Sequence, residues 1–161
     1  MGKKEDYRGP TGKILPGLPI DLDQALARLE KLFASKGVVA AYLFGSYADG
    51  SAVSSSDIDF AVLLPGNKSS SSDLYLNLLT DIQQTIGTER FDLLLLNKAS
   101  PFIQNEVVRN GKLIYARSIE ELNDFETKAR QKYLDTAYLR SVQNQYLKKR
   151  VEQWYSGKNT S

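Results

Sequence analysis

The sequence places three aspartates near the starts of two predicted strands, where their type and spacing are typical of a catalytic or metal-binding site. Asp57 and Asp59 open a predicted strand over residues 57–64, and side chains alternate along a strand, so both carboxylates should share one face. Asp92 is the only charge in the apolar run 91–96. Because a lone carboxylate in a buried strand is costly without a partner, we expect Asp92 to lie beside Asp57 and Asp59.

A cation is the natural partner of such a cluster. Neighbouring carboxylates repel and raise one another's pKa unless a cation joins them, and magnesium is the hard divalent ion that oxygen ligands suit best. The chain has no His and no Cys. Histidine-dependent triads, thiolate nucleophiles and Cys- or His-ligated metal sites are therefore excluded. Taken singly, each aspartate has a simpler interpretation as a turn cap, a solvent-facing residue or a strand-edge residue.

The pair Gly45-Ser46 supplies the opposite chemistry. It directly follows the apolar run 38–44, which is typical of a buried strand, and it opens a predicted helix. Glycine allows a phosphate to approach the backbone, and amides and a hydroxyl at such a turn bind anions. Alone, the pair is an ordinary helix cap. Together with the aspartates it predicts a phosphoryl-type site, in which two metal ions can stabilise the attacking and leaving oxygens.

The elements that must position these residues alternate between strands and helices. We expect strands at 38–44, 57–64, 91–96 and 112–116. Helices should begin after a cap at Asp21, after a cap at Ser72 or Asp73, and at Pro101. Residues 118–155 hold no Gly or Pro and predict one long helix or two helices with a bend. The order predicts a small α/β (α+β) domain with a helical extension.

Composition excludes several classes of protein. The 161 residues carry a net charge of only +2, so the chain is not a basic nucleic-acid coat, and we expect no direct nucleic-acid contact. No apolar run approaches the roughly 20 residues that span a bilayer, and no signal peptide is recognisable. We therefore expect no membrane association and a cytoplasmic location, with which the absence of Cys agrees.

Gly45-Ser46, a ten-residue gap, Asp57-Ile58-Asp59 and then Asp92 together resemble the signature of the nucleotidyltransferase superfamily typified by DNA polymerase β. The short chain and the long C-terminal helical segment look most like the minimal nucleotidyltransferases (the MNT group). Members of that group are antitoxins encoded beside HEPN-domain toxins. The resemblance implies a mixed sheet flanked by helices.

The resemblance also implies roles for the residues. Gly45 and Ser46 would bind the triphosphate of ATP, and Asp57, Asp59 and Asp92 would hold catalytic Mg²⁺, with Asp92 also helping to deprotonate the attacking hydroxyl. The reaction would transfer AMP from ATP to a tyrosine hydroxyl of the cognate HEPN toxin. On this basis we divide the chain into four parts: a flexible arm at 1–19, a nucleotidyltransferase domain at 20–117, a helical extension at 118–156 and a frayed tail at 157–161.

One position departs from the pattern. Many minimal members have Arg shortly after the Gly-Ser pair, whereas this chain reads Tyr47-Ala48-Asp49-Gly50. An acid there would repel phosphate, so a basic role is left for Lys68, Arg90 or a residue of the partner. The departure keeps open an antitoxin that acts by binding and occlusion with a decayed site. Two further alternatives do not depend on Asp49: a nucleotidyltransferase that acts on a small molecule or a nucleic-acid 3′ end, and a different α/β protein whose aspartates fall at these spacings by chance.

The C-terminal helical segment has two interpretations. Its apolar residues at helical spacing are typical of core packing, but a small domain cannot bury a helix of such length. Aromatic residues are enriched at interface cores, and this segment contains Phe125, Tyr133, Tyr138, Tyr146, Trp154 and Tyr155. We therefore expect a hetero-oligomer with the toxin, formed through this segment, and we interpret the basic cluster at 148–150 as a solvated face.

Overall fold

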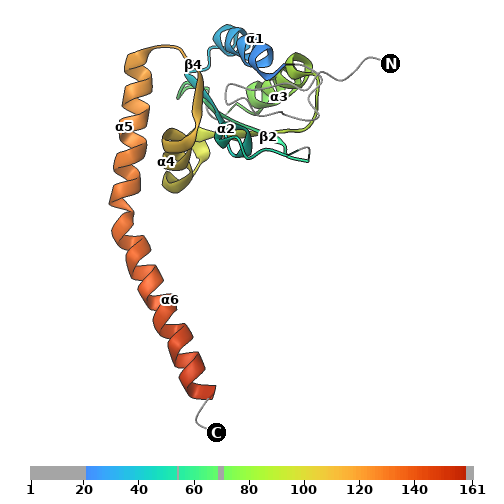
Figure 1. The fold of residues 1–161 in the computed structure, drawn as a ribbon. Helices are drawn as coiled ribbons and strands as arrows, with labels where there is room; N and C mark the ends of the chain where they lie inside the picture. The colour runs from blue at the N-terminus through green and yellow to red at the C-terminus, as the bar shows by residue number, and fades with distance from the viewer. Residues whose placement is uncertain (1–20, 54, 69–70, 159–161) are drawn as a thin grey trace.

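The computed structural model describes residues 21–53, 55–68 and 71–158, and its centre is a four-stranded sheet of order β3-β2-β1-β4 (Figure 1). The strands β2 and β3 run parallel, while β1 pairs antiparallel with both β2 and β4. The predicted mixed sheet is therefore confirmed. Its strands are β1 (Ala40–Phe44), β2 (Ile58–Leu63), β3 (Phe91–Leu95) and β4 (Lys112–Ala116).

Helices cover both faces of the sheet and divide the core into two layers. The larger layer lies under α1 (Leu22–Ser35) and α3 (Ser72–Ile86), and it includes Phe33 and Phe60. On the opposite face, α4 (Pro101–Asn110) and α5 (Ile119–Asp135) contribute Val107 and Leu122 to a smaller layer around Tyr42 and Ala61. Two short helices, α2 (Ser46–Asp49) and η1 (Leu96–Lys98), follow the ends of β1 and β3.

Side chains that cap the helices explain where they begin. The side-chain oxygens of Asp21, Ser71, Ser100 and Ser118 each accept a hydrogen bond from a backbone N–H in the first turn of the helix that follows. The start of α3 therefore follows Ser71, one residue before the predicted cap. At α4, Pro101 occupies the first turn, as the sequence predicted.

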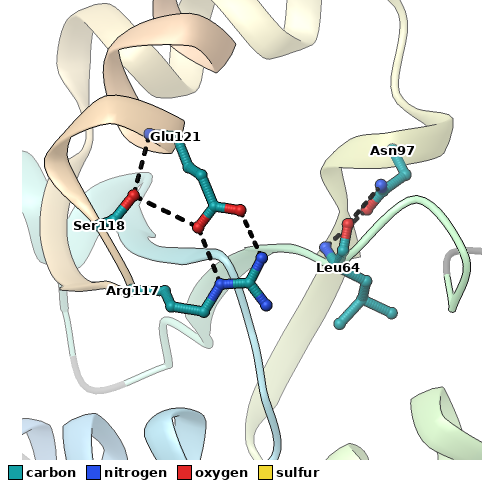
Figure 2. Close-up of polar contacts among 5 residues, drawn as sticks. All are labelled: Leu64, Asn97, Arg117, Ser118 and Glu121. Atoms are coloured by element: carbon teal, nitrogen blue, oxygen red, sulfur yellow. Dashed lines mark hydrogen bonds and ion pairs between the residues drawn. The ribbon is translucent and has the colours of Figure 1, made fainter.

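Two polar clusters fasten the connections between layers (Figure 2). The side-chain amide of Asn97 bonds both to the backbone N–H and to the carbonyl of Leu64, at 2.8 and 2.9 Å, so η1 is tied to the end of β2. Between β4 and α5, Arg117 Nε donates to Glu121 Oε2 at 2.8 Å, and Ser118 Oγ accepts from the Glu121 amide at 3.1 Å. These contacts set the direction in which α5 leaves the sheet.

The predicted helical extension consists of two helices. Helix α5 ends at Thr136, and α6 (Ala137–Lys158) extends away from the sheet and the helices that cover it (Figure 1). Helix α6 also enters the predicted tail at 157–161, of which residues 159–161 lie outside the described residues, as does the predicted arm at 1–19. The division into four parts stays a prediction. Among the described residues, no helix has the length and apolar character needed to cross a bilayer.

Candidate active site

The parallel pairing of β2 and β3 places two of the three predicted aspartates side by side. Asp59 lies opposite Asp92 in the strand register, and on its other side it pairs with Phe44, the last residue of β1. Ala61 and Leu94, two residues further along each strand, belong to the layer under α4 and α5. Since side chains alternate, Asp59 and Asp92 point toward that same face. The predicted proximity of Asp92 and Asp59 is therefore confirmed.

Electrostatics connects all three carboxylates. The pKa of Asp59 is raised above its ordinary value by burial first, then by the negative charge of Asp92 and then by that of Asp57. Burial is the largest cause, and the smaller contributions of Asp92 and Asp57 mean that like charges also surround Asp59. Such a place attracts a cation.

Asp57 has a different partner. It lies just before β2 on the surface, and its Oδ1 is 3.5 Å from Arg90 Nε, while Arg90 Nη2 donates to the Ser56 carbonyl at 3.1 Å. Within the part of the chain that the structure describes, no three acidic residues are grouped closely enough to hold one metal ion. The convergence of all three aspartates on one ion stays a prediction. Their all-oxygen donor set fits Mg²⁺ chemically, and Asp57 would have to turn away from Arg90 to join it.

Gly45 brings the predicted phosphate cradle against the acidic cluster. Its backbone has φ +68° and ψ −153°, which side-chain-bearing residues rarely adopt, and a Cβ at this position would lie 2.3 Å from Asp59 Oδ2. The glycine is therefore required both by conformation and by the close approach of Asp59. Ser46 follows at once and begins α2. Sequence reasoning placed Gly45 and Asp59 in one site, and the structure brings them into contact.

The structure gives Asp49 a local role. Its Oδ1 accepts hydrogen bonds from the amide and the hydroxyl of Ser51, at 2.8 and 2.6 Å, and so shapes the loop after α2. The two basic candidates lie at different ends of β2. Arg90 immediately precedes β3 and lies beside Asp57, at the end of β2 where Ile58 begins the strand. Lys68 follows the opposite end of β2, at Leu63, which is five residues or about 17 Å from Ile58. Only Arg90 lies near the acidic cluster.

The contact between Arg90 and Asp57 is the feature that sequence reasoning missed. Arg90 was one of two candidates for a missing basic residue, but nothing in the spacing paired it with an aspartate. The spacing indicates only that Arg90, which immediately precedes β3 and stands two residues before Asp92, lies near the aspartates; it indicates no particular partner. Tyr47 is a second neighbour: its hydroxyl reaches the Ser56 carbonyl at 3.5 Å, and burial raises its pKa.

Comparison with known proteins decides the family. The family model described as "Polymerase beta, Nucleotidyltransferase" matches residues 27–120, which is more than half of the chain and includes every candidate site residue. The chain belongs to the polymerase beta nucleotidyltransferase family. The resemblance read from Gly45-Ser46, Asp57-Ile58-Asp59 and Asp92 is therefore confirmed at the level of the family.

Individual relatives narrow the comparison. The chain is 33% identical over 95 residues to a protein adenylyltransferase, MntA, of Aphanizomenon flos-aquae (strain 2012/KM1/D3); the match covers 52% of this chain and 61% of that protein. A chain from the crystal structure of a toxin–antitoxin with AMP-PNP has a TM-score of 0.63 and 24% identity, covering 76% of this chain and 98% of that one.

A second solved structure has the same fold. It is a complex of tri-AMPylated Shewanella oneidensis HEPN toxin with MNT antitoxin, and the matched chain has a TM-score of 0.60 and 22% identity, covering 78% of this chain and 98% of that one. These likenesses show that this nucleotidyltransferase shares its fold with chains from toxin–antitoxin complexes. They also confirm the predicted fold, a mixed sheet flanked by helices with a long C-terminal helical segment.

Proposed function

We propose that this nucleotidyltransferase is an antitoxin that transfers AMP from ATP to a tyrosine hydroxyl of its cognate HEPN toxin and thereby neutralises it. The observation that carries the proposal is the contact of Gly45 with Asp59, beside Asp92, in a chain of this family. The similarity to a protein adenylyltransferase and to chains from toxin–antitoxin complexes supports the choice of acceptor.

In the proposed reaction the tyrosine oxygen forms a bond to the α-phosphorus of ATP, the bond from that phosphorus to the bridging oxygen breaks, and pyrophosphate leaves. Gly45 and Ser46 would receive the triphosphate, and Asp57, Asp59 and Asp92 would hold Mg²⁺. Magnesium, when bound, would neutralise charge on the phosphates. Asp92 would help to accept the hydroxyl proton, a role that suits a carboxylate in a chain that has no His.

We assign the missing basic role to Arg90. Its guanidinium lies at the same sheet end as the aspartates and contacts Asp57. If Asp57 turns toward a metal ion, Arg90 is left with its charge next to the position where the triphosphate would bind. A guanidinium suits this role because its donors match phosphate oxygens in pairs. Lys68 is excluded by its position beyond the far end of β2.

The direct test follows AMP into the toxin. The full chain, Mg²⁺, ATP labelled in its α-phosphate and the HEPN protein encoded beside it should give a toxin labelled on tyrosine. Asp59→Asn and Asp92→Asn should each reduce labelling by about a hundredfold or more, because each removes charge stabilisation from the reacting centre. Asp73→Asn, in the exposed first turn of α3, is the matched control and should label as well as the native chain. Equal labelling by Asp59→Asn would contradict the proposal.

A second candidate is an antitoxin that acts by occlusion without catalysis. Asp49 favours it, because an acid stands where many minimal nucleotidyltransferases have a basic residue. Neutralisation of the toxin in cells by a chain that lacks all three aspartates would favour occlusion over AMP transfer. The alternative substrate for the same site is an acceptor other than a protein, such as a small molecule or a nucleic-acid 3′ end. The cytoplasmic location of the protein stays a prediction.

A further inference from the structure

Helix α6 exposes an apolar surface that the described chain leaves uncovered. Every residue from Ser141 to Gly157 is exposed, and the helix extends beyond the sheet (Figure 1). The large apolar side chains of α6 range in exposure from 42% for Val142 to 75% for Tyr138. Contiguous exposed apolar surface of this kind marks sites of association. The exposed apolar side chains are Tyr138, Leu139, Val142, Tyr146, Leu147, Val151, Trp154 and Tyr155.

These side chains recur every four residues, so they do not form a single stripe parallel to the helix axis. Residues four apart form ridges on a helix surface, and α6 has four such ridges. One ridge holds Tyr138, Val142, Tyr146, Arg150 and Trp154, and the adjacent one holds Leu139, Gln143, Leu147, Val151 and Tyr155. The other two ridges contain only small, polar or charged residues. The apolar surface of α6 is therefore a pair of neighbouring ridges with one groove between them.

The winding of this groove restricts what can fill it. An apolar repeat of four residues is longer than the 3.6-residue turn, so the surface winds around α6 instead of running along it, and repeats longer than a turn favour right-handed crossings. A partner helix lying parallel to α6 would therefore contact the groove over only a short part of its length. A helix whose own four-residue ridge lies in the groove crosses at about −50°, the commonest arrangement of packed helices.

Charge determines the character of the occupant. Helix α6 carries five basic residues and one acid, Glu152, and Arg150 stands within an apolar ridge, its guanidinium 5.8 Å from the ring centre of Tyr146. Two copies of α6 crossing antiparallel near their middles would bring the basic triplets at 148–150 together, which costs energy. A helix with acidic side chains beside its apolar ridge would balance that charge.

We propose that the groove between the two apolar ridges of α6 docks a helix of a partner protein, crossing at about −50° and placing acidic side chains against Arg150 and its basic neighbours. The identity of that partner as the HEPN toxin rests on the proposed function. The exposed apolar side chains favour a protein over a nucleic acid as the partner. A nucleic acid would stack its bases on the aromatic rings and would leave the aliphatic residues of the groove without a function.

The test compares the ridges with the polar surface of the same helix. Tyr146→Ala with Val151→Ala changes one residue on each side of the groove, and alanine preserves the helix. Asn144→Ala with Gln153→Ala is the matched control on the polar ridges. Calorimetric binding of the full chain to the HEPN protein encoded beside it should weaken by about tenfold or more for the ridge pair. The control should bind as the native chain does, and circular dichroism should show equal helix content in all three.

Charge and alternative occupants complete the test. Arg150→Glu should weaken binding more than Arg150→Ala does, because the new carboxylate would lie against the acidic side chains of the partner helix. Equal binding by the ridge pair and the control would overturn the inference while leaving AMP transfer intact, whereas lost AMP transfer with ridge-dependent binding would overturn only the proposed function. The inference is also overturned if the native chain alone dimerises through the ridge residues. It is overturned as well if α6 binds a single-stranded RNA through Lys148 and Lys149 while binding of the toxin does not depend on the ridge residues.

Discussion

Gly45 is the residue at which the phosphate side and the acidic side of the site meet. Its positive φ and the 2.3 Å approach of Asp59 Oδ2 to the place a Cβ would occupy are separate constraints. The first concerns the backbone of Gly45 alone, and the second concerns the position of the Asp59 carboxylate, for which we propose a catalytic role. Substitution can separate them, because Gly37 has an almost identical φ of +69° and a Cβ there would meet no atom within 4 Å.

Gly45→Ala should therefore lose activity as well as stability. Both Gly45→Ala and Gly37→Ala should lower the free energy of unfolding by about 1–3 kcal/mol, the usual cost of an unfavourable φ. Only Gly45→Ala should also displace Asp59 and abolish AMP transfer at a temperature where both variants are folded. Thermal unfolding and a transfer assay measure the two effects. Normal transfer by Gly45→Ala would show that Asp59 does not need its present position.

Arg90→Ala should change metal and nucleotide binding in opposite directions. The loss of the guanidinium releases Asp57, so binding of Mg²⁺ alone should tighten, while binding of ATP with Mg²⁺ should weaken by about tenfold through the lost phosphate contact. Lys68→Ala is the control and should leave both unchanged. Isothermal titration gives both constants. Weaker nucleotide binding by Lys68→Ala, with no effect of Arg90→Ala, would show that the basic role belongs to Lys68 instead.

The site residues differ in how far sequence could predict them. The pairing of Asp59 with Asp92 followed from the expected order of the strands. The burial cost from which we argued it does not apply, because Asp92 is exposed on the edge strand β3, as its interpretation as a strand-edge residue predicted. The contact of Arg90 with Asp57 was not predictable, because it depends on the conformers of two exposed side chains, which no spacing encodes. The turn at Asp49 was missed for a different reason: its hydrogen bonds to Ser51 are local and leave no periodic pattern.

At the scale of elements, a partly buried hydrogen bond joins α5 to the sheet. Tyr42, in the middle of β1, is 2% exposed, and its hydroxyl donates to Glu126 Oε1 of α5 at 3.0 Å. Burial and then the charge of Glu126 raise the pKa of Tyr42 far above its ordinary value. This bond positions the helix from which α6 extends, so its loss should loosen the extension while leaving the acidic cluster in place.

Tyr42→Phe should lower the free energy of unfolding by about 1.5 kcal/mol, because the acceptor is charged. Tyr75→Phe, which removes a bond at 3.0 Å to the neutral Leu93 carbonyl, is the control and should cost less. Since Tyr42 keeps its proton longer in the folded than in the unfolded state, native stability should fall as pH rises above about 10, the ordinary tyrosine pKa. Tyr42→Phe should remove that part of the slope. An unchanged slope in denaturant unfolding would contradict it.

The elements themselves were largely predictable. Helix α4 begins at Pro101, and β4 begins directly after Gly111, as predicted, because proline and glycine mark these starts. Strand β1 begins two residues later than the apolar run that contains it. The break at Thr136 was an open alternative. Its position is not marked by Gly or Pro, and Arg140 stabilises it by donating to the Tyr133 carbonyl at 3.0 Å and lying 4.0 Å from the ring centre of Tyr133.

At the scale of the whole molecule, the two proposed functions lie in different places. The acidic cluster and Gly45 are held by the sheet, and the apolar ridges of α6 lie on the extension beyond it (Figure 1). A partner bound along α6 would be tethered to the same chain as the site, which raises the local concentration of an acceptor hydroxyl. Ridge substitutions should therefore reduce AMP transfer at low toxin concentration and leave it unchanged at saturating toxin.

The central claim is tested most directly by which phosphate of ATP reaches the toxin. The native chain is incubated with Mg²⁺, the HEPN protein encoded beside it and ATP labelled either in the α- or in the γ-phosphate, and the toxin's tyrosines are analysed by mass spectrometry. The account predicts that label from the α-phosphate is retained on tyrosine as AMP and that label from the γ-phosphate appears only in pyrophosphate. Transfer of the γ-label to the toxin, or an unmodified toxin that is nevertheless neutralised, would contradict it.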